Sequence, residues 1–240
     1  MSIGLSEEGW QLFDEVEAFV RRAKTVVQKI TVKELIDKGG INPYMTKALG
    51  MGTIYETVDF FVRRRVERSL GTSFGSTLDH SIRILMGGQE GRVLAAAQGQ
   101  WIAWWDIVLL GPRIVISVKS GPSDMNNDQI DKFMREAAKA KKNQFEPYLA
   151  FVYGKQPFSL TKNCLIKKGF NVANNLLVGK AIFTRFIPGP IGYKETLAIL
   201  GLMKGGIGII RADMQQRITY LATLLGQTYS TLDDMLDAMF

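Results

Sequence analysis

Two apolar, β-branched runs separated by a tight-turn dipeptide constrain the fold of this chain more than any other feature. The runs are Trp101–Leu110 and Arg113–Val118, and Gly111 with Pro112 joins them. Short apolar runs bounded by Gly and Pro predict two buried strands that meet at a turn. A later apolar run, Pro147–Tyr153, predicts a third strand, so we expect a β-sheet rather than an all-helical fold.

Two charged residues interrupt this apolar pattern. Asp106 lies within the first run, and Lys119 directly follows the second. A lone charge in a buried strand is costly unless it is paired or holds a metal ion. If the two strands pair as a hairpin, the carboxylate and the ammonium are expected at the same end of the sheet. These two residues are therefore the first candidates for a functional site.

Helical patterns surround the predicted strands. Apolar residues at three-and-four spacing predict amphipathic helices, which Gly-rich or Pro-containing segments are expected to end. The expected helices are 7–29, 32–37, 53–69, 76–86 and about 126–142, followed by a short strand near 176–178 and a helix from about 179. A C-terminal helical region is expected from 191–204, 209–225 and 230–240. Residues 71–75 are expected to separate two helices, and Ile41–Met45 to form a turn.

This order of elements predicts an α/β fold with a central mixed β-sheet flanked by helices and with helical N- and C-terminal regions. A chain of 240 residues is long enough to bury one good-sized core. We therefore predict a single domain, residues 1–240. Its catalytic core is expected at about 72–155, its helical N-terminal region at 1–70, and a region for dimerisation or recognition at 156–240.

Composition narrows the class of protein. No uncharged apolar stretch reaches the roughly 18 to 20 residues that a membrane span needs, and no secretory signal is visible at the N-terminus. The single cysteine, Cys164, excludes an internal disulfide and suits a reducing, cytoplasmic location. The single histidine, His80, disfavours Ser-His and multi-His metal chemistry, which leaves carboxylates, lysines and a hard metal ion. The net charge of +7 permits binding to a polyanion.

The spacing from Asp106 to Ser117, Val118 and Lys119 resembles the PD-(D/E)xK signature of the Mg²⁺-dependent nuclease superfamily, which includes most type II restriction endonucleases. Ser117 stands where that signature has Asp or Glu. Other segments resemble, in the same order, the group of restriction endonucleases with a KSGP or KAGP loop. They are Asn42–Tyr44, Thr72–Gly75, Leu78 with Asp79, Val118–Pro122, Met125 with Asn126, Gly179–Ala181, Phe183 and Tyr193.

In enzymes of this group, a helix carboxylate at the position of Asp79 helps to order the metal or its water. The resemblance therefore implies a site made of Asp79, Asp106, Ser117 and Lys119, with Mg²⁺ as the cofactor. Asp106 is the expected principal metal ligand. Lys119 is expected either to orient or deprotonate the attacking water, or to stabilise the transition state as a cation.

Ser117 leaves the expected metal shell one negative charge short. Some restriction enzymes that resemble this pattern carry Ser-x-Lys and recruit an acid from the following helix. In this chain that segment contains Asp128, Asp131 and Glu136, and Asp79 lies upstream. We expect Asp79 to compensate for the missing carboxylate, and Asp131 is the second candidate metal ligand.

Candidate DNA contacts fall in two parts of the chain. The loop at Ser120 and Gly121 can offer backbone N–H groups to a phosphate, although a plain tight turn explains it as well. Arg63 and Arg64, near the end of a predicted helix, either contact phosphate or favour the helix dipole. Three amides either bind DNA or cap a helix. They are Asn126, Asn127 and Gln129.

Together these features predict a type II restriction endonuclease that hydrolyses phosphodiester bonds in double-stranded DNA at a short, palindromic sequence with Mg²⁺. A two-fold symmetric target matches a two-fold symmetric protein, so a homodimer is expected, and no membrane partner is. The alternatives are a structure-selective or repair nuclease, a pseudo-nuclease in which Asp106 and Lys119 form only a buried ion pair, a basic DNA-binding protein without catalysis, and a Schiff-base enzyme that uses Lys119.

Overall fold

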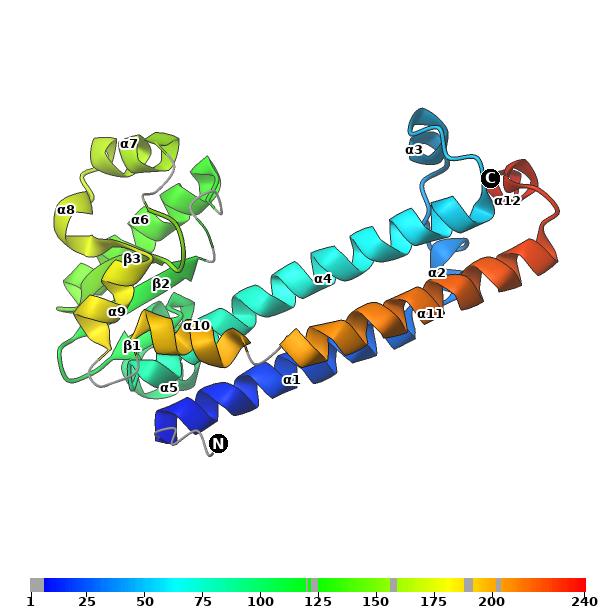
Figure 1. Ribbon diagram of the computed structural model, residues 1–240. Coiled ribbons are helices and arrows are strands. Elements are labelled where there is room, and N and C mark those ends of the chain that lie inside the picture. The colour runs from blue at the N-terminus through cyan, green and yellow to red at the C-terminus, as the bar shows by residue number, and fades with distance from the viewer. Residues whose placement is uncertain (1–6, 120, 122–124, 156–158, 188–191, 202–203) are drawn as a thin grey trace. The chain divides into compact units, whose positions relative to one another are not determined.

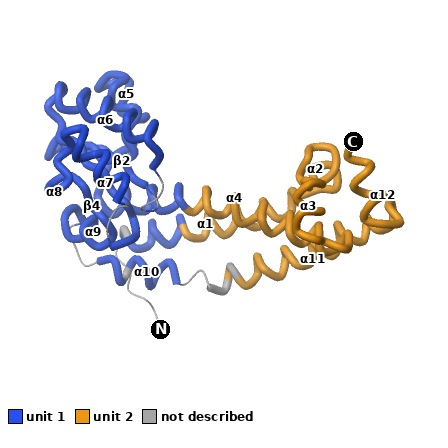
Figure 2. Tube along the Cα trace, turned by 90° about the horizontal axis from the view of Figure 1, so that it is seen from above, with its two compact units in different colours: residues 1–15, 75–201 blue, residues 16–74, 202–240 orange. Residues whose placement is uncertain are grey.

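The computed structural model describes residues 7–119, 121, 125–155, 159–187, 192–201 and 204–240. Contacts within the chain divide it into two compact units, which Figure 2 colours separately. Unit 1 contains residues 1–15 and 75–201, and unit 2 contains residues 16–74 and 202–240. Helices α1 (Glu7–Lys29) and α4 (Ile54–Leu85) supply residues to both units. The single domain with three consecutive regions stays a prediction, and each unit is described by itself below.

A four-stranded mixed β-sheet forms the centre of unit 1 (Figure 1). Its strands are β1 (Ile107–Leu109), β2 (Ile114–Lys119), β3 (Glu146–Phe151) and β4 (Leu176–Val178), in the spatial order β1-β2-β3-β4. Strands β1 and β2 form an antiparallel hairpin, whereas β2, β3 and β4 are parallel neighbours. The prediction of an α/β fold with a mixed sheet is therefore confirmed.

Helices cover both faces of this sheet because the strands carry apolar side chains on both sides. Val115 of β2 packs on one face with Phe133 of helix α6 (Asn127–Lys142). Ile116, its neighbour in β2, packs on the other face with Ile82 of α4. Helix α6 connects β2 to β3, since two parallel strands need a crossover connection. This two-sided burial fixes which residues of β2 can face a functional site.

Shorter helical segments complete unit 1. Helix α5 and the 3₁₀ helix η1 pack on the α6 face through Leu94 and Ile102, and α9 packs on the opposite face through Ile182. The segments are α5 (Gly91–Gln98), η1 (Gln100–Trp104), α7 (Ser159–Lys167), α8 (Val172–Asn175), α9 (Lys180–Phe186) and α10 (Tyr193–Gly201).

Within its described residues, unit 2 has helices as its only regular secondary structure. Its core joins α1, α4 and α11 (Lys204–Thr228), which run alongside one another in Figures 1 and 2, and Val27, Val62 and Leu221 are buried members of that core. Three short helices complete it: α2 (Val32–Leu35), α3 (Pro43–Ala48) and α12 (Leu232–Asp237). Among the helices that the structure describes, none combines the length and apolar character of a membrane-spanning segment.

The prediction that Trp101–Leu110 forms one strand is wrong for its first half. Residues 100–104 form η1, and the strand itself is confined to Ile107–Leu109. Ile102 and Trp105, which are almost fully buried, lie three residues apart, and this is the repeat of a 3₁₀ helix. A short apolar run does not by itself distinguish a buried strand from a buried helical turn.

The predicted break at residues 71–75 is also wrong, because Gly71 and Gly75 lie inside the continuous helix α4. A glycine in a helix interior costs about 1 kcal/mol relative to alanine. Local packing offsets that cost: the rings of Phe74 and Phe19 meet edge to face at 5.5 Å. Tertiary contacts therefore carry the helix through two residues that would weaken it in isolation.

The predicted turn at Ile41–Met45 is wrong as well, since Pro43 begins helix α3. Asn42 caps this helix, because its side-chain oxygen accepts a hydrogen bond of 3.0 Å from the Met45 backbone N–H. Asparagine before a proline at the first helical position is a helix-start signal. Asn42 and Pro43 are also common in turns, so the sequence alone did not distinguish a turn from a helix start.

Candidate active site

Asp106 lies between η1 and β1, where its carboxylate reaches the neighbouring strand. Its Oδ2 atom accepts a hydrogen bond of 2.7 Å from the Val118 backbone N–H and one of 3.2 Å from the Ser117 hydroxyl. Ile107 pairs with Ile116 as the first residue of β1, so the backbone of Val118 extends beyond the ladder. The Asp106 carboxylate therefore accepts a backbone hydrogen bond from β2 at a point where β1 no longer pairs with that strand.

Ser117 and Lys119 lie on the same side of β2, because side chains alternate along a strand. Both line one cavity of about 700 Å³ together with Asp106, so the structure brings the predicted acid, hydroxyl and amine together. Ser117 is buried at 1% exposure, and Lys119 is half-buried. The tight turn at Gly111 and the antiparallel pairing of β1 with β2 account for this convergence.

Burial dominates the electrostatics of Asp106. Loss of hydration raises the pKa of Asp106 above its ordinary value, and the nearby charge of Glu90 adds to that effect. The positive charge of Lys119 and the hydrogen bonds from Val118 and Ser117 lower the pKa, but by less. The carboxylate is therefore held in an environment that favours either a proton or a bound cation.

Three further carboxylates line the same cavity. Asp79 comes from α4, Glu90 directly precedes α5, and Glu136 comes from α6. Glu136 is buried at 9% exposure, and its Oε1 atom pairs with Lys139 Nζ at 2.8 Å. The structure thus brings the predicted Asp79 to the site and adds two acids that the sequence prediction did not select.

Asp131 does not line this cavity. Its carboxylate pairs with Lys168 at 2.6 Å, and that hydrogen bond raises the pKa of Lys168. Asp131 and Glu136 are five residues apart, which separates them by roughly 140° around a helix of 3.6 residues per turn. The use of Asp131 as a metal ligand therefore stays a prediction that the cavity does not support: the α6 carboxylate that lines the cavity with Asp106 is Glu136, while Asp128 is exposed in the first turn.

The position of Glu136 has a signal in the sequence. It lies three residues after Phe133 and four before Ala140, which are both buried on the face that α6 turns toward the sheet. An acid at that spacing is on the edge of an apolar stripe. Glu90 follows the Gly87–Gly88 pair and has no comparable pattern, so it could not be found from periodicity.

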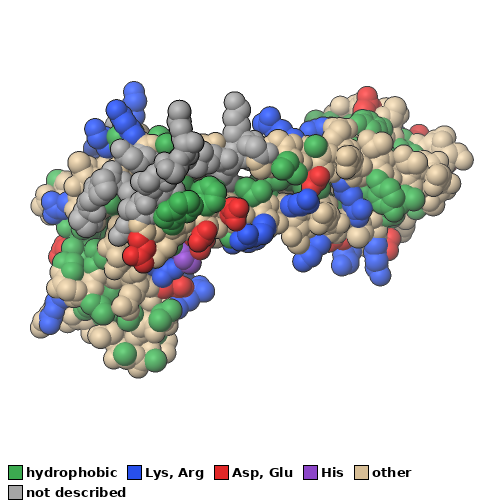
Figure 3. All heavy atoms as spheres, turned by 60° about the horizontal axis from the view of Figure 1, so that its bottom comes forward, with side chains coloured by type: hydrophobic (Ala, Val, Ile, Leu, Met, Phe, Trp, Pro, Cys, Tyr) green, Lys and Arg blue, Asp and Glu red, His purple; other side chains and the backbone are tan. Residues whose placement is uncertain are grey.

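Cations surround the carboxylates. The cavity is lined by Arg83, Arg92, Lys119, Lys132 and Lys139. Figure 3 shows acidic and basic side chains gathered next to one another on the face that it presents. Opposite charges at this density suit a site that binds an anion through the cations and a metal ion through the carboxylates.

The amides predicted to contact DNA begin helix α6. Asn126 Oδ1 accepts a hydrogen bond from the Gln129 backbone N–H at 2.9 Å, and Gln129 Oε1 accepts one from the Asn126 N–H at 3.0 Å. This reciprocal pair is a capping box, so the capping alternative holds for both residues. Asn127 Oδ1 lies 3.8 Å from the thiol sulfur of Cys164.

Gly121 is buried against Tyr153, and Ser120 lies outside the described residues. A Cβ atom at Gly121 would overlap the Tyr153 hydroxyl, so this position tolerates only glycine while the ring stays where it is. Close packing against a side chain therefore accounts for the glycine. Its predicted contact with phosphate stays a prediction.

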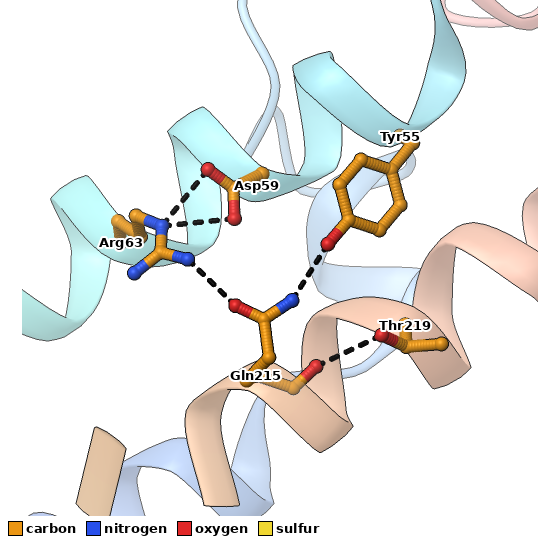
Figure 4. Close-up of polar contacts among 5 residues, drawn as sticks. All are labelled: Tyr55, Asp59, Arg63, Gln215 and Thr219. Carbon is orange, nitrogen blue, oxygen red and sulfur yellow. Dashed lines mark hydrogen bonds and ion pairs between the residues drawn. The ribbon is translucent and has the colours of Figure 1, made fainter. Parts of the chain in front are cut away.

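Arg63 and Arg64 lie in unit 2, whereas the cavity lies within unit 1. Figure 4 shows Arg63 directed at Asp59 and Gln215: its Nε lies 2.8 Å from both Asp59 oxygens, and one terminal nitrogen donates to Gln215 Oε1 at 2.8 Å. Gln215 in turn donates to the Tyr55 hydroxyl at 2.6 Å. The bond to Asp59 raises the pKa of Arg63.

Arg64 also has partners inside unit 2. Its guanidinium contacts the Met45 sulfur at 2.9 Å and lies over the ring of Phe60, 6.0 Å from the centroid. Arg63 thus ties α4 to α11, and Arg64 ties α4 to α3. Neither residue is among those that line the cavity, and their role in DNA binding stays a prediction.

The donor set of the cavity suits a hard cation that keeps part of its water shell. Among the described residues, no three His, Cys, Asp or Glu side chains form a closed metal-binding group. Mg²⁺ needs fewer protein ligands, since it is usually held by one or two carboxylates, water and substrate phosphate. Both hydrogen bonds that Asp106 makes to described residues fall on Oδ2, so within this part of the chain Oδ1 is the oxygen that could meet a cation.

Unit 1 is thus an α/β unit with an acid, a hydroxyl and an amine at the end of a central strand, facing further carboxylates. No protein-family model matches the chain, and no curated protein matches it either.

Proposed function

We propose that this protein is a metal-dependent nuclease that hydrolyses phosphodiester bonds in DNA. The observation that carries the proposal is the convergence of Asp106, Ser117 and Lys119 on one cavity that Glu136 and Asp79 also line. Two carboxylates and an amine around one site are the groups that metal-assisted phosphodiester hydrolysis needs. The buried Ser117 adds no charge, and Glu136 supplies the carboxylate that this position lacks.

Each residue of the site would have its own role. Asp106 and Glu136 would hold Mg²⁺, with Asp79 ordering its water, and the ion when bound activates water and neutralises charge on the phosphate. Ser117 and the Val118 N–H orient the Asp106 carboxylate through Oδ2. Lys119 either positions the attacking water or stabilises charge on the phosphate as a cation. Lys139 holds Glu136 through the 2.8 Å ion pair.

The finer proposal is a type II restriction endonuclease with a restriction-endonuclease-like fold, acting in the cytoplasm as a homodimer on a short, palindromic duplex sequence. Support comes from the acid–Ser-x-Lys spacing and from the mixed sheet that presents it. Two-fold symmetric sites are read by two-fold symmetric proteins.

One experiment tests both levels. The purified protein is incubated with long, mixed-sequence duplex DNA with Mg²⁺ or with a chelator, and the fragment ends are sequenced. Ends that share one sequence and need Mg²⁺ support the restriction endonuclease. Cleavage confined to nicks, junctions or ends indicates a structure-selective nuclease, and no cleavage by the wild type contradicts the proposal. Asp106→Asn is the control that excludes a contaminating nuclease.

A second candidate is a DNA-binding protein without catalysis. It is favoured by the two hydrogen bonds of Asp106, which give this carboxylate a structural role, and by the lack of a closed three-acid group among the described residues. In that case wild type and Asp106→Asn bind DNA equally, and neither cuts it. Divalent ions would then lower the DNA affinity of both proteins to the same extent, as added salt does, and leave the DNA uncut.

A further inference from the structure

Three of the five cations that line the cavity are already engaged by its other residues. Lys139 pairs with Glu136, Arg83 contacts the His80 ring at 3.0 Å, and the charge of Lys119 acts on Asp106. Glu136 partly neutralises the charge of Lys139, the His80 ring takes up a contact of Arg83 without neutralising it, and Lys119 already has a role in the proposed chemistry.

Arg92 and Lys132 differ from these three. Within the described part of the chain, neither side chain makes a hydrogen bond or an ion pair, and both are exposed. They come from two separate elements, since Arg92 is the second residue of α5 and Lys132 lies in α6. The cavity therefore has two uncommitted cations on two parts of its wall.

Rigid packing holds the backbones that carry these two side chains. Leu94 of α5 and Phe133 of α6 are buried in the same apolar cluster, beside Trp105. Each cation is thus a long, exposed side chain on a helix that a buried apolar residue anchors. That combination suits contact with a flexible, repeating anion, because the long side chain can adjust the position of its charged group while the helix holds the backbone in place.

We propose that Arg92 and Lys132 bind the backbone phosphates next to the scissile one, which rests on the proposed nuclease function. The ligand class is a phosphodiester polymer rather than a single phosphate, because the two cations come from different helices, α5 and α6, and neither belongs to the segment that carries Asp106, Ser117 and Lys119. The Arg92 guanidinium can hold a phosphate through two hydrogen bonds, while Lys132 acts as a point charge. Such contacts fix position and register without reading sequence.

This assignment replaces the arginines expected from the sequence. Arg63 gives its hydrogen bonds to Asp59 and Gln215, whereas the Arg92 side chain has none to any residue that the structure describes. A cation that must first break internal bonds contributes less to binding. The uncommitted pair is therefore the better phosphate site.

The test measures binding without catalysis. A fluorescent duplex is titrated in chelator over a series of KCl concentrations, with wild type, Arg92→Ala, Lys132→Ala and the double variant. Each lost phosphate contact should lower the slope of log affinity against log salt by about 0.9, and the double variant by about twice that. The loss should be the same for duplexes of unrelated sequence.

Arg135→Ala and Lys162→Ala are the matched controls, since both residues are exposed in unit 1 and outside the cavity lining. Their slopes should equal that of wild type. If the two test variants keep the wild-type slope while wild type still binds and cuts DNA, the phosphate assignment is overturned and the nuclease stands. If wild type neither binds nor cuts duplex DNA, the proposed function itself fails, and the assignment fails with it.

Discussion

The backbone N–H of Val118 donates a 2.7 Å hydrogen bond to Asp106 Oδ2, although the two residues are twelve positions apart. The same carboxylate oxygen accepts from Ser117, so β2 holds Asp106 from two consecutive residues. The Asp106 carboxylate therefore has two roles. It accepts the hydrogen bonds from β2, which an asparagine side chain could also do, and it carries a negative charge, which asparagine does not. These two roles can be separated by mutation.

Asp106→Asn should make the metal-free protein more stable than wild type at neutral pH. Burial raises the folded-state pKa of Asp106 above its ordinary value of 3.8, so the folded protein binds the proton more tightly than the unfolded chain. Stability then falls as pH rises from 3.8 through the raised folded pKa, and stays lower above it. Asparagine does not titrate, so the stability difference between variant and wild type should grow across that window.

The measurement is denaturant unfolding at several pH values in chelator. Asp106→Ala is the control, because it removes the acceptor of the Val118 N–H as well, and an unsatisfied buried donor costs about 1–3 kcal/mol. A difference between Asp106→Asn and wild type that stays constant over pH 3 to 8 would contradict the prediction.

Glu136→Gln should reduce Mg²⁺-dependent cleavage by about 10–100-fold, the usual cost of losing a group that holds or orients a metal ion. Asp131→Asn is the matched control on the same helix, because it breaks only the half-exposed pair with Lys168. Rates at several Mg²⁺ concentrations separate weaker metal binding from slower chemistry. An equal loss of cleavage activity in both variants would contradict the assignment of Glu136 to the active site.

Arg63→Ala should weaken unit 2 by about 1 kcal/mol and leave DNA affinity unchanged, since its guanidinium ties α4 to Gln215 of α11. Arg68→Ala is the control, because this exposed arginine of the same helix has no side-chain partner among the described residues. Chemical unfolding and duplex titration are measured on both. A lower salt slope with unchanged stability in Arg63→Ala would restore its predicted role in DNA binding.

Gly91→Ala should destabilise unit 1 by about 2–3 kcal/mol and disturb the active site. A Cβ atom at this position would overlap the Ile102 carbonyl oxygen and lie 2.7 Å from that of Trp105, the residue before Asp106. Gly111→Ala is the control, because a Cβ there meets open space. Thermal unfolding and cleavage are measured together, and a fully stable, fully active Gly91→Ala would show that α5 and η1 can separate without consequence.

Local sequence determined a large part of the fold. The bounds of α1 follow its three-and-four apolar spacing, and the start of α6 follows the Asn126 and Gln129 pair, which closes its capping box within four residues. The strands β2 and β3 follow their apolar runs. These elements depend on contacts between near neighbours along the chain, which a pattern of residue types records directly.

The acid and the amine of the site were also visible in the sequence, because Asp106 and Lys119 interrupt apolar runs. The turn at Gly111 joins those runs, and hairpin pairing brings both side chains to one cavity. A charge in an apolar strand is costly, so a charged residue within such a run is a candidate for a specific role.

Only the tertiary structure decided which other charges face that pair. Glu136 reaches the cavity and Asp131 does not, because packing of Phe133 against the sheet sets the rotation of α6. Arg63 is engaged by Gln215, which lies 152 positions away, and no local pattern records such a contact. The type of a charged residue determines which ligands it can bind. The rotation and packing of its helix determine which other residues it contacts.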